Sequence, residues 1–362
     1  MTIPASTSPP VVRPALDSIP AYKAGKPAAV GAQTSYKLSS NENPYPPLPS
    51  VVEQVAAAAA GLNRYPDMSV ASLHAALADK VGVEVAQIAT GAGSVAVLYH
   101  LLQALCTEGD EVVYAWRSFE AYPIAVGLTG AHSLQVPLTA GARHDLSAMV
   151  DAITEATKAV VVCSPNNPTG PAVHRDELVE LVESVPQHVV VVIDEAYREF
   201  VTDPDSVDGL ELARGRDNVV VLRTFSKAYG LAGLRVGYAV APITLAEAIR
   251  KCALPFGVSQ LAQAAALASL AAEAELFERV EALVIERERV VAALQDQGWD
   301  VPSAQGNFVW MPLGAEALSF AEACDAAGVS VRPFQGDGVR VSIGEPAAND
   351  IFLEVARRFG SA

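Results

Sequence analysis

The sequence has little cysteine, no paired histidines and no long apolar run, and each absence excludes a class of protein. The 4 cysteines show no C-x-x-C spacing, which predicts reduced thiols rather than a disulfide framework or a zinc site. The 6 histidines show no H-x-x-x-H or similar spacing, so we expect no bound metal ion. No apolar run approaches the roughly 20 residues of a membrane span, and the N-terminus lacks the charged and apolar regions of a signal peptide. We therefore predict a cytoplasmic protein that does not bind a membrane.

Basic residues are scarce as well. The chain has 25 lysines and arginines against 41 aspartates and glutamates, which gives a formal net charge of −16. A protein that binds nucleic acid would carry a basic stripe, and we find none, so we expect no nucleic-acid partner. Anionic small molecules are not excluded, because a local group of arginines can overcome the global charge.

The chain is rich in apolar residues. Its 362 residues, 51% of them hydrophobic, are enough for two domains around a substantial core. From residue 86 onward, short apolar segments alternate with helical patterns, as in α/β proteins. Several segments, such as Val189–Ile193, are continuous valine and isoleucine runs, typical of strands buried on both faces of a mostly parallel sheet. The predicted strands are 86–90, 111–115, 132–136, 159–163, 188–193, 218–223 and 235–240.

Helical periodicity divides the remaining sequence. Helices are predicted at 50–61, 69–81, 93–106, 145–156 and 174–184, and one long Ala-rich helical region at 258–296. A smaller α+β domain follows, with strand 307–312, helix 316–327, strands 329–332 and 339–343, and helix 347–359. The proline-rich residues 1–49 are expected to form an extended arm across both domains. The predicted division is therefore an arm with small-domain contact (1–49), a large domain (50–257), and a bridging helix with the small domain (258–362).

One lysine stands out by its position. Lys227 follows the apolar run Val219–Leu222, and Thr224, Ser226 and Arg235 are close to it in sequence. A lone lysine is most often a solvated charge. A lysine just past a buried strand can instead form a Schiff base with a carbonyl cofactor. The neighbouring hydroxyls and guanidinium can then hold that cofactor's phosphate.

Polar or glycine-rich segments follow three further predicted strands. Ligands of an open parallel sheet bind at the carboxyl ends of its strands. Each segment alone has an ordinary structural explanation as a turn or a helix cap. Because all of them occur in order at one edge of the sheet, they jointly favour a binding site. The segments are Gly91–Ser94, Ser164–Gly170 and Asp194–Tyr197.

Together these residues resemble the pyridoxal-phosphate aminotransferases of fold type I. Within them the chain is similar to the histidinol-phosphate aminotransferase branch, and most similar to the actinobacterial phenylalanine (aromatic amino acid) aminotransferases. The resemblance implies pyridoxal 5′-phosphate as cofactor. It also implies an α/β fold, with a large cofactor-binding domain around a mostly parallel sheet covered by helices and a smaller α+β C-terminal domain. The motifs are Leu38–Pro44, Asn63–Asp67, Asn166–Gly170, Asp194–Tyr197, Phe225–Gly237 and Arg340–Gly344.

The resemblance assigns contacts to the cofactor ring. Lys227 would carry the cofactor on its amine and, once freed, move a proton from the substrate Cα. Asp194 would pair with the pyridine nitrogen and keep it protonated. Asn167 and Tyr197 would hydrogen-bond the ring oxygen O3′. Phe119 would stack on the ring, where many relatives have tyrosine.

The resemblance also assigns the phosphate contacts. The phosphate would bind the backbone N–H groups of Ala92, Gly93 and Ser94 at the start of a helix. Tyr65 matches a tyrosine that reaches the phosphate from the neighbouring subunit, which implies a homodimer with shared active sites. The side chains expected to complete the cradle are Thr224, Ser226 and Arg235.

The substrate is less closely specified. Arg340 matches the arginine that grips the substrate α-carboxylate, and Asn43 is assigned to the substrate site as well. The resemblance favours transamination between phenylalanine or tyrosine and 2-oxoglutarate. The alternative is histidinol-phosphate transamination in histidine biosynthesis, because Arg332 and Tyr22 match positions that contact substrate in those enzymes. The aromatic residues Trp116, Phe119, Tyr122 and Phe256 could supply apolar walls, although packing in the core is the commoner role of any single one of them.

Two hypotheses from other classes have less support. A fold type I decarboxylase could share Lys227, Asp194 and Asn167, and would release carbon dioxide without a keto-acid product. A pyridoxal-phosphate-sensing regulator would need a DNA-binding segment, and residues 1–49 are too rich in proline and too poor in basic residues to supply one. The sequence therefore predicts an aminotransferase acting on small amino and 2-oxo acids.

Overall fold

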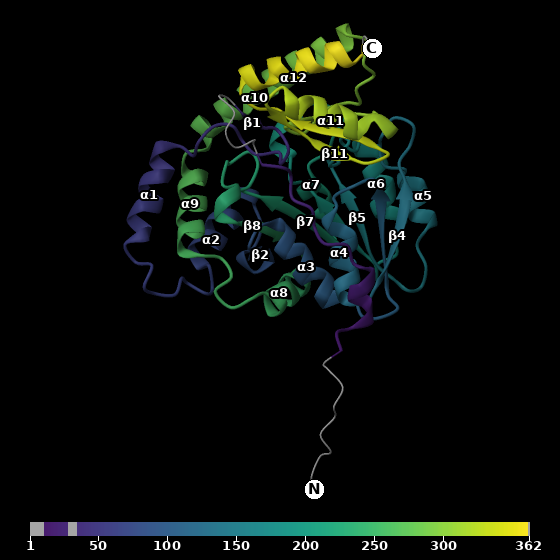
Figure 1. The fold of residues 1–362 in the computed structure, drawn as a ribbon. Coiled ribbons are helices and arrows are strands. Elements are labelled where there is room, and N and C mark those ends of the chain that lie inside the picture. The colour runs from purple at the N-terminus through teal and green to yellow at the C-terminus, as the bar shows by residue number, and fades with distance from the viewer. Residues whose placement is uncertain (1–10, 28–34, 361–362) are drawn as a thin grey trace.

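A seven-stranded sheet forms the centre of the protein, in a computed structural model that describes residues 11–27 and 35–360 (Figure 1). The strand order is β2-β8-β7-β6-β5-β3-β4. Neighbouring strands are parallel except at β8, which is antiparallel to both β2 and β7. The predicted mostly parallel sheet is confirmed. Its strands are β2 (Ile88–Gly91), β3 (Glu111–Trp116), β4 (His132–Pro137), β5 (Thr157–Cys163), β6 (Val190–Asp194), β7 (Val219–Thr224) and β8 (Gly237–Val240).

The middle of the sheet consists largely of valine. Nearly every residue of β5, β6 and β7 is buried, because alternate side chains enter cores on opposite faces. Val191 of β6, for example, belongs to one core and the adjacent Val192 to the other. β-Branched side chains suit such a doubly covered surface.

Helices cover both faces of the sheet. On one face, α3 (Ser94–Leu105), α4 (Ala121–Thr129) and α8 (Ile243–Cys252) contribute to a shared core. The opposite core takes side chains from the remaining helices of this region. They are α2 (Ala71–Val81), α5 (Leu146–Asp151), α6 (Arg175–Ser184) and the short α7 (Gly209–Ala213).

The region predicted as one long helix forms two. α9 (Gln260–Ala271) packs beside α1 (Pro49–Ala59), and α10 (Glu273–Asp296) continues toward the C-terminal elements. Ala272 separates the two helices with a non-helical backbone, φ −110° and ψ 23°. The prediction of a single helix over 258–296 was therefore wrong at this point. The predicted helix 145–156 was also too long, since α5 ends at Asp151.

The C-terminal elements gather at one end of the molecule, above the carboxyl ends of the parallel strands (Figure 1). A three-stranded antiparallel sheet has the order β11-β12-β9. Its strands are β9 (Phe308–Met311), β11 (Arg332–Phe334) and β12 (Gly338–Ser342), and the helices beside them are α11 (Ala317–Ala326) and α12 (Pro346–Phe359).

The N-terminal arm contacts both parts of the molecule. A 3-10 turn, η1 (Pro14–Ser18), lies against α4, where Arg13 donates to Leu128 O at 3.0 Å. Further along, β1 (Tyr36–Lys37) pairs in parallel with β10 (Val329–Ser330). Residues 1–10 and 28–34 of the predicted arm lie outside the described residues. None of the helices that the structure describes is both long and apolar enough to cross a membrane.

Candidate active site

One cavity collects most of the residues predicted for the site. It lies where β5, β6 and β7 end, between the start of α3, the small C-terminal sheet and the N-terminal arm. The sheet topology thus brings together segments that are far apart in sequence, as expected for the switch region of an α/β fold. The predicted residues that line the cavity are Tyr22, Ser94, Phe119, Asn167, Asp194, Tyr197, Thr224, Ser226, Lys227, Arg235, Arg332 and Arg340.

Lys227 presents its amine to this cavity without an anionic partner. Nζ donates to the backbone carbonyls of Ser40 at 3.2 Å and Asn41 at 3.3 Å, and it forms no ion pair among the described residues. Burial, and then the nearby positive charge of Arg340, lower the pKa of the Lys227 amine to about 7. A neutral amine is therefore accessible near neutral pH, as a nucleophilic lysine requires.

Asp194 is a buried carboxylate with one unsatisfied oxygen. It is the last residue of β6, and its Oδ2 accepts a hydrogen bond of 2.8 Å from the Tyr122 hydroxyl. Its Oδ1 is buried without a partner among the described residues. Burial raises the pKa of Asp194 to about 6, although the Tyr122 hydrogen bond lowers it. A buried oxygen of this kind needs a donor, and a protonated ring nitrogen would supply one.

Arg340 is a buried guanidinium that faces neutral oxygens only. It lies on β12, where Nη2 donates to Ser39 O at 2.8 Å and Nη1 donates to Asn167 Oδ1. Its Nε has no partner among the described residues. Burial lowers the pKa of Arg340. Because a buried cation without a counter-ion is costly, this position suits an anionic ligand group.

Tyr197 connects the cavity to the segment after β1. Its hydroxyl accepts a hydrogen bond of 3.0 Å from Asn41 Nδ2, and burial raises the pKa of Tyr197 above its usual range. Asn41 in turn accepts through Oδ1 from Ser342 Oγ at 3.0 Å. Sequence reasoning did not assign Asn41 a role, although it lies inside the quoted motif Leu38–Pro44.

The start of α3 lies against the loop that carries Arg235. Ser94 is the first residue of α3 and lines the cavity. Arg235 Nη1 donates to Ser226 Oγ at 3.2 Å, and Thr224 Oγ1 accepts from the backbone N–H of Ser226 at 3.1 Å. A helix N-terminus, three hydroxyls and a guanidinium at one end of a cavity form an anion-binding arrangement. Ala92 does not line the cavity.

Gly93 has a packing role in the structure, and its contact with a phosphate stays a prediction. Its backbone N–H donates to Gly91 O at 2.7 Å. A side chain at Gly93 would collide with Arg235, whose Nη2 would lie 2.5 Å from the added Cβ. Gly93, with φ of +82°, therefore permits the close approach of the Arg235 guanidinium to the helix start.

Two further predicted residues lie outside the cavity of their own chain. Tyr65 is 81% exposed and stacks on Phe256 with ring centroids 4.5 Å apart. Asn43 Nδ2 donates to the backbone carbonyl of Ala228 at 3.0 Å, next to Lys227. Asn43 thus holds the loop that carries the lysine and does not itself line the cavity.

The predicted apolar walls are only partly in place. Phe119 lines the cavity and contacts Tyr22 edge-on, with ring centroids 6.5 Å apart. Trp116 and Phe256 do not line it, and Phe256 borders a different cavity. Tyr122 is buried behind Phe119, and its hydroxyl donates a hydrogen bond to Asp194.

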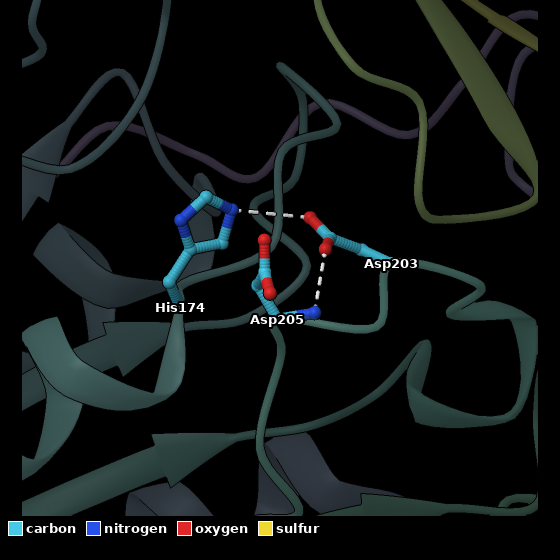
Figure 2. A group of neighbouring side chains, drawn as sticks. All are labelled: His174, Asp203 and Asp205. Carbon is cyan, nitrogen blue, oxygen red and sulfur yellow. Dashed lines mark hydrogen bonds and ion pairs between the residues drawn. The ribbon is translucent and has the colours of Figure 1, made fainter.

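A second group of polar side chains lies outside the cavity (Figure 2). His174 Nε2 is 3.2 Å from Asp203 Oδ2, and Asp203 Oδ1 accepts from the backbone N–H of Asp205 at 2.9 Å. Potential metal ligands in these three residues lie within 4.8 Å of one another. Arg143 Nη1, however, is 3.4 Å from the same imidazole nitrogen, and its positive charge disfavours a cation. The contact between His174 and Asp203 thus links the start of α6 to the loop before α7.

Comparison with known proteins agrees with this geometry. The family model described as aminotransferase class I and II matches residues 34–355. An aromatic amino acid aminotransferase of Streptomyces coelicolor is 60% identical, over 98% of this chain and 99% of that relative. One of Thermobifida fusca is 57% identical, over 97% and 98%.

Solved structures with a similar fold are aminotransferases as well. Histidinol-phosphate aminotransferase from Sinorhizobium meliloti in complex with pyridoxal-5′-phosphate has a TM-score of 0.87 and 28% identity, over 98% of this chain and 99% of that one. Aspartate aminotransferase from Thermus thermophilus with maleate has a TM-score of 0.80 and 26% identity, over 90% and 91%. With the family model covering most of the chain and the lysine, carboxylate and guanidinium meeting in one cavity, this chain belongs to the class I and II aminotransferases.

Proposed function

We propose that this chain is a pyridoxal-phosphate-dependent aromatic amino acid aminotransferase that transfers the amino group of phenylalanine or tyrosine to 2-oxoglutarate. Membership of the aminotransferase family and the 60% identical relative named for aromatic amino acids support the reaction and the substrate class. The S. meliloti neighbour, whose description names bound pyridoxal-5′-phosphate, supports the cofactor.

One observation carries this proposal. Lys227, Asp194 and Arg340 face one cavity, and none of the three has a partner of opposite charge among the described residues. An amine, a carboxylate and a guanidinium left unpaired in a low-dielectric site are costly. A ligand with an aldehyde, a protonated ring nitrogen and an amino-acid carboxylate nearby would complement all three.

The cofactor fits the residues that are present. Lys227 would hold it covalently through Nζ, and the unpartnered Asp194 Oδ1 would accept from its ring nitrogen. Asn167 Oδ1 accepts a hydrogen bond from Arg340. The amide Nδ2 of Asn167 could therefore donate to a ring oxygen of the cofactor, beside Tyr197. When bound, pyridoxal phosphate supplies an electron sink for the negative charge that develops at the substrate Cα. Its phosphate would be held by Ser94, Thr224, Ser226 and Arg235.

The chain's own residues would then act on the substrate. Arg340 would bind the α-carboxylate and so fix the orientation of the Cα–H bond. Once released, Lys227 Nζ would take the proton from Cα, a task that its lowered pKa suits near neutral pH. Tyr122 would hold the Asp194 carboxylate in place behind the ring through its 2.8 Å hydrogen bond.

The assembly belongs to the same proposal. Tyr65 is exposed and does not line the cavity of its own chain, which suits a side chain that reaches the phosphate site of a second copy. We therefore propose a homodimer with shared active sites. The division into arm (1–49), large domain (50–257) and bridging helix with small domain (258–362), and the cytoplasmic location, stay predictions from the sequence.

The alternative substrate is histidinol phosphate. It is favoured by the histidinol-phosphate aminotransferase among the structural neighbours, and by Arg332 and Tyr22, which both line the cavity. No observation favours a decarboxylase or a cofactor-sensing regulator over a member of the aminotransferase family.

The deciding experiment compares kcat/KM for phenylalanine, tyrosine and histidinol phosphate, each with 2-oxoglutarate as acceptor. We expect both aromatic amino acids to exceed histidinol phosphate. A large preference for histidinol phosphate would reverse the substrate assignment. The absence of any keto-acid product from all three would overturn the proposed transamination itself.

A further inference from the structure

The cavity contains a second arginine whose charge is already balanced. Arg332 Nη2 forms an ion pair of 2.6 Å with Glu120 Oε2, and Nη1 donates to the backbone carbonyl of Ala24 at 3.1 Å. The side chains of Arg332 and Glu120 are 12% and 30% exposed, and both residues line the cavity. The ion pair is therefore part of the cavity wall, with its guanidinium mostly buried and its carboxylate partly exposed.

Arg332 and Arg340 are cross-strand neighbours. In the register of β11 with β12, Arg332 lies directly opposite Arg340, so the two side chains project from the same face of this sheet. Their environments differ, however. Arg340 contacts neutral oxygens only, whereas Arg332 has a carboxylate within hydrogen-bond distance. Two like charges this close repel each other, and Glu120 compensates one of them.

We propose that Glu120 determines substrate specificity, because its ion pair with Arg332 makes this part of the cavity wall charge-neutral. This inference rests on the proposed function. Arg340 is left as the guanidinium that offers an uncompensated charge to the substrate α-carboxylate. A substrate side chain that ends in a doubly charged phosphate would find Arg332 already neutralised by Glu120. Glu120 would repel this phosphate more strongly than the single side-chain carboxylate of 2-oxoglutarate. An uncharged ring meets no such penalty.

The surroundings of the ion pair suit an uncharged ring. Glu120 directly follows Phe119, whose ring contacts Tyr22 edge-on. On the other side, the Phe334 ring centroid lies 5.5 Å from Arg332 Cζ. Tyr22, Phe119 and Phe334 all line the cavity. Aromatic side chains pack favourably against such rings, so the apolar walls and the neutral ion pair favour the same substrates.

The test removes only the charge of Glu120. In Glu120→Gln we expect kcat/KM for histidinol phosphate to rise roughly tenfold, the size of one partly buried charge–charge interaction. The corresponding constant for phenylalanine should stay within about twofold, since its ring carries no charge. The double variant Glu120→Gln with Arg332→Gln should lose the gain. Glu120→Ala is made in parallel, so that a folding defect of one variant does not decide the outcome.

A matched control exists on the same side of the protein. Asp337 pairs with Arg117, and neither residue lines the cavity. Asp337→Asn therefore removes one charge from an arginine–carboxylate pair that lies outside the cavity. It should leave the ratio of the two kcat/KM values unchanged.

A binding measurement separates substrate recognition from turnover. Calorimetry gives the Kd of 3-phosphonopropionate, which has one carboxylate and one phosphonate, and of 3-phenylpropionate, which has one carboxylate and an uncharged ring. Glu120→Gln should tighten 3-phosphonopropionate binding several-fold relative to 3-phenylpropionate. Equal effects on both probes would contradict a role in charge discrimination.

The failure of this inference can be distinguished from the failure of the proposed function. Normal phenylalanine turnover with an unchanged substrate ratio in Glu120→Gln would overturn the role of Glu120 alone. The role of Glu120 would also be overturned if Asp337→Asn changed the ratio of the two kcat/KM values as Glu120→Gln does. The same holds if the rise in kcat/KM for histidinol phosphate persisted in the double variant that also lacks Arg332. A wild-type protein that transaminates neither substrate, or that already prefers histidinol phosphate, would overturn the proposed function and this inference with it.

Discussion

At the scale of single residues, the cavity is defined by charges that the protein leaves unpaired. Lys227 and Arg340 bring positive charge and Asp194 brings negative charge, yet the three do not form ion pairs with one another. Folding alone would favour pairing them or replacing them with apolar groups. We therefore infer that ligands supply the missing partners.

The lowered pKa of Lys227 predicts how cofactor uptake depends on pH. Burial and the Arg340 charge lower this pKa from 10.5 to about 7, so the amine is protonated below that pH and neutral above it. Only the neutral amine can attack an aldehyde. The rate at which cofactor-free protein takes up pyridoxal phosphate should therefore rise with pH through about 7 and then level off, as followed by stopped-flow absorbance.

Lys227→Ala provides the control for this measurement. Without the amine, the variant should develop no covalent-cofactor absorbance band at any pH, and it should not transaminate. A wild-type rate that keeps rising beyond pH 9 would mean that the pKa of Lys227 is close to its usual value.

Tyr122 offers a second prediction at this scale. Tyr122→Phe removes the 2.8 Å hydrogen bond to Asp194 Oδ2 and leaves the ring packing in place. A hydrogen bond to a buried charged group contributes about 1.5–3 kcal/mol. We expect cofactor affinity and kcat to fall roughly tenfold or more, with little change in KM for phenylalanine. Equilibrium binding of the cofactor and steady-state kinetics measure both effects.

Tyr114 supplies the matched control for Tyr122. Its ring packs 5.6 Å from the Tyr122 ring, and its hydroxyl accepts from Gln135 rather than serving Asp194. Tyr114→Phe thus removes the same atom from the same core. If both variants lost cofactor affinity equally, the effect would come from core packing, and the assigned role of Tyr122 would be wrong.

At the scale of elements, the site depends on a close approach between β8 and the start of α3. A Cβ at Gly237 would lie 2.3 Å from the backbone nitrogen of Ser94 and 2.8 Å from the carbonyl carbon of Gly93. These atoms are backbone and cannot move aside independently. Glycine at this position therefore sets how near α3 comes to the strand that follows Arg235.

Gly237→Ala should separate these two elements. We expect a loss of about 2–3 kcal/mol in the free energy of unfolding, typical of overpacking, together with weaker cofactor binding. Gly233→Ala is the control, because nothing lies within 4 Å of the added Cβ there. Chemical denaturation and cofactor titration of both variants give the comparison. Equal stability of the two would show that the approach of α3 to β8 is not tight.

Element boundaries show where the sequence signals end. The central strands β5, β6 and β7 were predicted closely because long valine runs permit little else in a doubly covered sheet. The predicted strand 329–332 was wrong, since it is divided between β10 and β11 in two different sheets. The break between α9 and α10 was missed, since Ala272 is a good helix former. Glu273 at the start of α10 accepts from both Lys80 and Tyr229, and these contacts come from distant parts of the chain. The helix predicted at 145–156 was too long for a similar reason, namely a constraint from the tertiary structure. The chain leaves the helix at Asp151 because it must reach the start of β5 at Thr157.

At the scale of the whole molecule, the exposed Tyr65 predicts a shared active site. We expect homodimers of Lys227→Ala and of Tyr65→Ala to be poorly active for different reasons. In a heterodimer of the two variants, one site would combine Lys227 of one copy with Tyr65 of the other. Co-expression with two affinity tags and tandem purification should therefore yield a heterodimer with about half of the wild-type activity.

The alternative geometry gives a different result. If Tyr65 served the cavity of its own chain, every site in this heterodimer would lack either Lys227 or Tyr65. Activity would then stay at the level of the parent variants. A fully active Tyr65→Ala homodimer would remove Tyr65 from the site altogether.

The sequence alone determined the fold class and the cofactor motif, because both depend on local order along the chain. Buried strands are recognisable as apolar runs, and the polar segments that end them share one edge of a parallel sheet. On this basis, and by resemblance to the fold type I aminotransferases, Lys227, Asp194 and Asn167 were predicted as site residues without coordinates, and all three line one cavity.

Only the tertiary structure decided which charges are left unpaired in the cavity and which are already balanced. Arg340 and Arg332 were both predicted from the sequence as substrate residues, yet among the described residues only Arg332 has a carboxylate partner, Glu120, which is 212 residues away in the sequence. Tyr122 and Asp194 meet across 72 residues in the same manner. Such pairings depend on how distant segments pack, since electrostatic energies are set by distance and burial rather than by sequence order.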